Sequence, residues 1–162
     1  MHGEQTTRYI FLPFHIQMKL FDTKIIAISN QKGGVGKTTS AVNIAAYLAV
    51  TETPTLLIDM DPQSNATSGV GIEIGSYKQS IYDVVIGKAK LSDVVQKTDL
   101  EFLDVVPSSA QLVGAEIELV SLFSRERMLK EALEDVEGKY KYIDRKSTRL
   151  NSSHKPISYA GF

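Results

Sequence analysis

The stretch Lys32-Gly33-Gly34-Val35-Gly36-Lys37-Thr38-Thr39 decides the fold of this 162-residue chain. Residues 24–30, just before it, are rich in isoleucine and predict a buried parallel strand. Residues 40–50, just after it, are almost continuously apolar and predict a helix packed on a sheet. A strand, a glycine-rich loop and a helix in this order predict a phosphate-binding loop, because the backbone N–H groups and the positive helix end face an anion there.

The polar residues of this loop predict the ligand class. Lys37 is placed to reach the β- and γ-phosphates of a nucleotide, and the Thr38 hydroxyl is placed to ligate Mg²⁺. We therefore expect residues 32–39 to bind a nucleoside triphosphate. The alternative interpretation is a glycine-rich turn with two solvated lysines.

A second motif follows about twenty residues later. Residues 56–59, Leu-Leu-Ile-Asp, predict a short buried strand that ends in a carboxylate, and the next residues read Met-Asp-Pro-Gln-Ser-Asn-Ala-Thr. Carboxylates at the carboxyl end of a parallel strand face the crevice in which α/β folds bind ligands. Asp59 and Asp61 are thus candidate site residues. The alternative is an Asx turn with Pro62 fixing the bend.

Both motifs resemble one family. An ordinary phosphate-binding loop reads G-x-x-x-x-G-K-[ST], but Gln31 occupies the first glycine position and Lys32 precedes the glycine pair. The pattern K-G-G-x-G-K-[ST], called the deviant Walker A motif, resembles the ParA/MinD group of ATPases. The string D-x-D-P-Q-x-N-A-T is similar to the ParA/Soj partition ATPases rather than to the MinD branch. Residues 103–109 and 112–119 extend the resemblance, which covers about residues 18–143.

The resemblance implies a fold, a cofactor and residue roles. The fold would be the amino-terminal part of a doubly wound, mostly parallel α/β P-loop NTPase, with ATP and Mg²⁺ bound at Lys32, Gly33, Gly34, Val35, Gly36, Lys37, Thr38 and Thr39. The catalytic residues would be Lys32, which reaches the partner's phosphates in a dimer, together with Lys37 and Asp61, which orients the attacking water. Thr38 would ligate Mg²⁺, and Asp59 and Asp61 would act on it indirectly, through water.

The resemblance also implies partners and a location. The full-length parent would form an ATP-dependent homodimer, bind DNA non-specifically through residues that this chain lacks, and respond to a ParB-like activator. It would be cytoplasmic and nucleoid-associated, with no membrane association. A MinD-like regulator, another ATP-dependent enzyme of the deviant-loop group, or a truncated fragment without catalysis are the alternatives. The chain contains no cysteine, which excludes disulfides and thiolate metal sites.

Hydrophobic spacing and turn residues predict the remaining elements. The expected strands are residues 24–30, 55–59 and 101–106, with a further one beginning at 140–143; the expected helices are residues 40–50, 80–86, 91–97, 110–122 and 124–138. We expect Ser124 to cap the last helix and Gly138 to end it. Residues 64–79 are rich in glycine and serine and predict a loop over the nucleotide crevice.

The two ends of the chain fall outside the resemblance. Residues 1–17 are expected to be a non-domain extension with Met18 as the native start, the alternative being a genuine amino-terminal arm. By the resemblance, residues 18–143 are expected to be a partial ATPase domain, truncated before the Walker B strand. Residues 144–162 resemble a translated sequencing adapter, and their serine, arginine and asparagine content predicts a non-native or disordered tail. Asp144 comes too early in its strand to be the Walker B aspartate.

Overall fold

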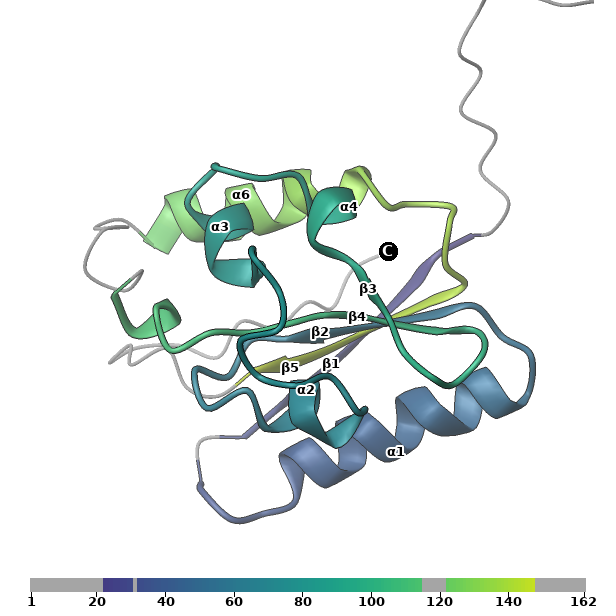
Figure 1. Cartoon of the computed structure of the whole chain (residues 1–162). Helices are drawn as coiled ribbons and strands as arrows, with labels where there is room; N and C mark the ends of the chain where they lie inside the picture. The colour runs from purple at the N-terminus through teal and green to yellow at the C-terminus, as the bar shows by residue number, and fades with distance from the viewer. Residues whose placement is uncertain (1–21, 31, 115–121, 148–162) are drawn as a thin grey trace, which may run out of the picture.

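The computed structural model describes residues 22–30, 32–114 and 122–147, which form a five-stranded sheet with helices on both faces (Figure 1). The strands are β1 (Lys24–Ser29), β2 (Thr55–Asp59), β3 (Gln96–Lys97), β4 (Leu103–Val106) and β5 (Tyr142–Ser147). Their order across the sheet is β1-β5-β2-β4-β3. All neighbours pair in parallel except β3, which is antiparallel to β4. The expected α/β fold with a mostly parallel sheet is confirmed.

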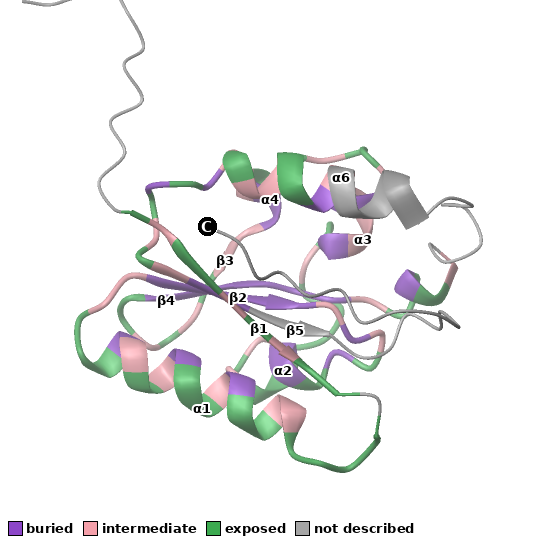
Figure 2. Cartoon of the chain, turned by 180° about the vertical axis from the view of Figure 1, so that it is seen from behind, coloured by how far each residue is buried: buried purple, intermediate pink, exposed green. Residues whose placement is uncertain are grey.

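The helices divide between the two faces of this sheet. One face carries α1 (Lys37–Val50) and α2 (Asn65–Gly69), and the other carries α3 (Ile81–Val85), α4 (Leu91–Val94) and α6 (Leu122–Glu134) (Figures 1 and 2). This two-sided covering explains why all five residues of β2 are buried. No helix in the described part of the chain is long and apolar enough to span a bilayer.

Helix α1 packs closely on the sheet because its buried face is made of small residues. Ala41, Ala45 and Ala49 are at most 2% exposed and form one cluster with apolar residues of β2 and β4. Their spacing of four residues places them on one side of the helix. The loop at the amino end of α1 is therefore held against the carboxyl edge of the sheet.

Several element boundaries differ from the sequence prediction. Residues 64–79 were expected to be a loop, but they contain α2, whose first turn donates hydrogen bonds to the Asp59 carboxylate. The helix expected at 91–97 ends at Val94, and residues 96–97 instead pair with β4. Ser124 lies inside α6 rather than at its cap. Most of the helix expected at 110–122 lies outside the described residues.

The fifth strand corrects the prediction for the carboxy-terminal tail. β5 continues through Ser147, so the expectation of a disordered tail from residue 144 is wrong for residues 144–147. The reason is its position between β1 and β2, where both neighbours offer backbone hydrogen-bonding partners whatever the side chains are. Residues 148–162 and 1–17 lie outside the described residues. That the tail is foreign to the gene stays a prediction.

Asp144 places a carboxylate inside the apolar layer beneath α1. It is fully buried, and neither carboxylate oxygen has a hydrogen-bond partner in the described part of the chain. In the sheet it pairs with Ile26 and Leu57, and burial raises its pKa to about 7. Asp144 thus lies in the middle of β5, and the residue of β5 that pairs with Asp59 is Lys146.

We predict that Asp144→Val stabilises the chain, most strongly above neutral pH. The folded state keeps the Asp144 proton up to about pH 7, whereas the unfolded chain loses it near the ordinary aspartate pKa of about 4. The free energy of unfolding of the wild type therefore falls as the pH rises between these two values. We expect Val to raise this free energy by roughly a few kcal/mol at alkaline pH, with a smaller gain in acid.

Urea unfolding at several pH values measures this effect. Asp99→Val, at an exposed aspartate, is the matched control and should leave stability nearly unchanged. An Asp144→Val gain that is the same in acid and in alkali would show that ionisation of this carboxylate is not the cause.

Candidate functional site

The glycine-rich loop leaves its inner side open at the amino end of α1. Gly34 and Gly36 have φ angles of 70° and 80°, which favour glycine. A Cβ atom built on Gly33, Gly34 or Gly36 would meet nothing within 4 Å. These glycines therefore face open space rather than packing against the protein. An anion fits this space, because amides at the start of α1 have no helical partner.

The two lysines of the loop occupy different positions. The Lys37 ammonium donates a hydrogen bond to the Lys32 carbonyl oxygen at 2.9 Å, so it lies across the loop. The Lys32 amide donates to the Asn30 side chain at 3.0 Å, and Lys32 itself is exposed. The structure thus holds the Lys37 charge over the loop and leaves Lys32 at the surface.

Asp59, at the end of β2, is committed to hydrogen bonds within the protein. Its Oδ2 accepts from the amides of Ala66 and Thr67 at 3.0 and 2.8 Å and from the Thr67 hydroxyl at 2.9 Å. Its Oδ1 accepts from the Asp61 amide at 3.1 Å. The carboxylate is fully buried and anchors the first turn of α2. These four hydrogen bonds fix Asp59 within the protein, and its indirect effect on a bound metal stays a prediction.

Asp61 lies in a tight turn directly after this anchor. Its Oδ1 accepts from the Gln63 amide at 3.1 Å, and its carbonyl accepts from the Ser64 amide at 2.8 Å. Ser64 has a φ of 54°, a left-handed conformation that non-glycine residues seldom adopt. Asp61 is only 5% exposed, yet it lines the cleft described next. Its carboxylate is held in place before any ligand binds.

One cleft brings most of the predicted site residues together. It has a volume of about 800 Å³ and joins the glycine-rich loop to the turn after β2. Its lining consists of residues 33–39 together with Asp61, Pro62, Gln63, Asn65 and Val113. Lys32 and Asp59 do not line it. Among the described residues, no group of three or more His, Cys, Asp or Glu side chains could hold a metal by themselves. Mg²⁺ held by Thr38 and a nucleotide's own phosphates is compatible with this donor set.

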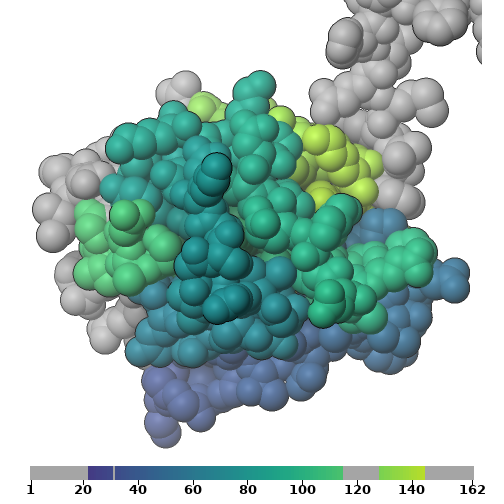
Figure 3. All heavy atoms as spheres, viewed as in Figure 1, coloured from purple at the N-terminus to yellow at the C-terminus, as the bar shows by residue number. Residues whose placement is uncertain are grey.

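The sequence analysis missed three residues that support this turn. Thr67 both donates to Asp59 and accepts from the Ser108 amide at 3.1 Å, and Tyr77 donates to the Ser108 carbonyl at 2.5 Å. Burial raises the pKa of the Tyr77 hydroxyl, so it stays a donor. Figure 3 shows the segment between α2 and α3 (teal), which contains Tyr77, on the surface between α1 and the opposite helix layer. Thr67 stands inside the quoted motif, but only the fold brings it to Ser108.

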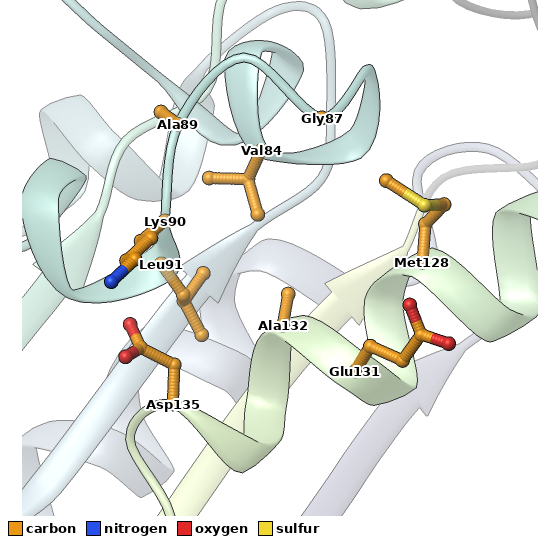
Figure 4. Close-up of a pocket in the computed structure, with 9 residues that line it drawn as sticks. All are labelled: Val84, Gly87, Ala89, Lys90, Leu91, Met128, Glu131, Ala132 and Asp135. Atoms are coloured by element: carbon orange, nitrogen blue, oxygen red, sulfur yellow. The ribbon is translucent and has the colours of Figure 1, made fainter.

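A second cavity lies apart from the loop, among α3, α4 and α6. It has a volume of about 280 Å³, and Figure 4 shows the side chains of Val84, Leu91 and Ala132 around it. Burial would raise the pKa of Asp135 at its rim, but hydrogen bonds from Ser92 hold that pKa below the ordinary value. The Asp135 carboxylate therefore binds the first turn of α4, where it accepts a hydrogen bond from the Ser92 amide at 2.8 Å.

Comparison with known proteins places this geometry in a family. A family model described as an AAA domain matches residues 23–144. The sporulation initiation inhibitor protein Soj of Bacillus subtilis is 55% identical over 120 residues, which cover 74% of this chain and 47% of Soj. The chain thus spans about half the length of this relative.

Solved structures show the same partial coverage. Cobyrinic acid a,c-diamide synthase from Mycobacterium smegmatis, with a bound ATP analogue and magnesium, superposes with a TM-score of 0.72 at 33% identity, over 76% of this chain and 50% of that one. A plasmid partition protein from Borrelia burgdorferi superposes with a TM-score of 0.65 at 30% identity, over 78% and 56% of the two chains. With the loop, the turn after β2 and the sheet order, these matches show that the chain belongs to the ParA/Soj family of AAA-domain P-loop ATPases.

Proposed function

We propose that residues 32–39 bind the phosphates of ATP together with Mg²⁺, and that the full-length parent is a partition ATPase. The observation that carries this proposal is the open loop at the start of α1, with the Lys37 ammonium held across it. Bound Mg²⁺ would neutralise part of the phosphate charge, and Thr38 is the residue of this chain that would hold it.

The turn after β2 supports a hydrolytic role for the parent. Asp61 lines the same cleft as the loop, and its carboxylate orientation is set by the Gln63 amide. A carboxylate held in this way can orient an attacking water beside the terminal phosphate. We propose this role for Asp61 and a supporting one for Asp59, whose carboxylate binds the Asp61 amide.

The family supports a proposal for the parent's assembly and partners. We propose an ATP-dependent homodimer that binds DNA non-specifically and is stimulated by a ParB-like protein, as in chromosome or plasmid partition. Lys32 is exposed beside the cleft, where its ammonium could reach phosphates bound by a second protomer. The DNA-binding residues would lie in the half of the parent that this chain does not span.

An ATP-dependent biosynthetic enzyme is the second candidate, because cobyrinic acid a,c-diamide synthase superposes on most of this chain. The two candidates differ in what activates ATP hydrolysis by the parent. DNA and a ParB-like protein should stimulate a partition ATPase, whereas a carboxylic acid that is converted to an amide should stimulate a synthase of this kind.

We predict that Lys37→Ala lowers the affinity of the chain for Mg-ATP at least tenfold, since a fixed cation and its hydrogen bonds to phosphate are lost together. Titration with a fluorescent ATP analogue measures this. Lys78→Ala, at an exposed lysine outside the cleft, is the matched control and should bind as the wild type does. Unchanged affinity in Lys37→Ala would exclude the loop as the phosphate site.

We predict that Lys32→Ala in the full-length parent separates nucleotide binding from assembly. Its monomer should still bind ATP, because the Lys37 ammonium and the loop amides remain. It should not dimerise with ATP or hydrolyse it, because the charge that reaches the partner's phosphates is missing. Sedimentation with and without ATP measures whether the variant dimerises. A normal dimer with normal turnover would make Lys32 a surface lysine only.

We predict that Asp61→Asn in the parent binds ATP and dimerises but loses hydrolysis. Asparagine keeps an oxygen that can accept from the Gln63 amide, so the turn should survive while the charge that orients water is lost. Phosphate release under single-turnover conditions is the measurement. Hydrolysis at the parental rate would leave Asp61 as a turn residue without a catalytic role.

A further inference from the structure

A continuous set of hydrogen bonds joins the ends of two neighbouring strands beneath the Asp61 turn. It starts at the Asp59 carboxylate at the end of β2, passes through the Thr67 hydroxyl and reaches the Ser108 amide just after β4. Thr67 and Ser108 are both fully buried. From the other side, Tyr77 donates to the Ser108 carbonyl.

This set of bonds can control where Asp61 lies. The Asp59 carboxylate binds the Asp61 amide through Oδ1 and is fixed through Oδ2 by three donors, one of which is the Thr67 hydroxyl. A carboxylate held by both oxygens cannot rotate without breaking several buried hydrogen bonds. The Thr67 hydroxyl is the donor of this group that also couples Asp59 to β4, since its oxygen accepts from Ser108.

We propose that Thr67 is a positioning residue for Asp61, and that Tyr77 supports it by holding Ser108. This role rests on the proposed function of Asp61. Thr67 does not line the cleft, so we infer that it acts through Asp59, to which its hydroxyl donates. The coupling also means that a displacement of the segment after β4 would be transmitted to the Asp61 turn.

Amide hydrogen exchange of the 162-residue chain, without nucleotide, tests the positioning directly. Thr67→Val keeps the side-chain shape and removes the hydroxyl. We expect it to accelerate exchange at the Asp61 and Gln63 amides on the order of tenfold relative to the amides of Leu57 and Val105 in the sheet. Thr67→Ser, which keeps the hydroxyl, should restore slow exchange.

Tyr77→Phe is a milder second variant that removes one hydroxyl, and it should shift the same two amides in the same direction. Its matched control is Tyr140→Phe, which removes a hydroxyl bound to Asp104 at the opposite end of β4 and should leave them unchanged. Unchanged exchange at Asp61 and Gln63 in Thr67→Val would overturn the proposal. Equal acceleration in the sheet would also overturn it, because Thr67 would then contribute only to global stability.

Hydrolysis by the full-length parent connects the positioning to the site. If Thr67 acts through Asp61, Thr67→Val in the parent should lower the rate of phosphate release and leave the affinity for Mg-ATP near the wild-type value, as expected for Asp61→Asn, and hydrolysis at the parental rate would contradict the proposal. Wild-type affinity for Mg-ATP, measured by titration, tests the proposed function separately from the exchange result.

Discussion

The four hydrogen bonds to the Asp59 carboxylate are the interaction on which the arrangement of the site depends. A buried carboxylate is costly unless its lone pairs are bound, and Asp59 binds amides on both sides of the turn that follows β2. The same bonds begin α2 and fix the turn that contains Asp61. Because β2 lies between β5 and β4, with helices on both faces, this anchor stands on the central strand of the sheet.

Asp144 shows the opposite case in the neighbouring strand. It is as buried as Asp59, but its two oxygens lack hydrogen-bond partners among the described residues. Burial therefore disfavours its charged form, and no hydrogen bond offsets this cost. The two aspartates show that the position of a buried carboxylate in its strand decides whether it finds hydrogen-bond donors. A carboxylate at the end of a strand meets the amides of the following turn, whereas one in mid-strand meets the apolar face of a helix. The sequence of β5 from Asp144 onward therefore suits a central strand poorly, although its backbone pairs on both sides.

The parts that could be predicted from the sequence are those decided by local patterns. The glycine-rich loop, the strand that ends at Asp59 and the apolar face of α1 depend on neighbouring residues, and the structure places them as expected. The parts that could not be predicted depend on distant partners. Helix α2 is short and rich in polar residues, and it begins where the Asp59 carboxylate binds its amides. The Thr67 contact with Ser108 spans 41 residues and exists only once β2 and β4 are paired. β3 has two residues, too few for a periodic signal.

The central claim is that the loop at residues 32–39 binds the phosphates of ATP. Backbone amide shifts of the isotope-labelled chain, recorded by NMR during titration with Mg-ATP, test it most directly. The account predicts saturable shifts at the amides of Gly33, Gly34 and Gly36, accompanied by a shift at Asp61 across the cleft. Saturable shifts confined to the cavity around Met128 and Ala132, with the three glycine amides unmoved, would contradict it.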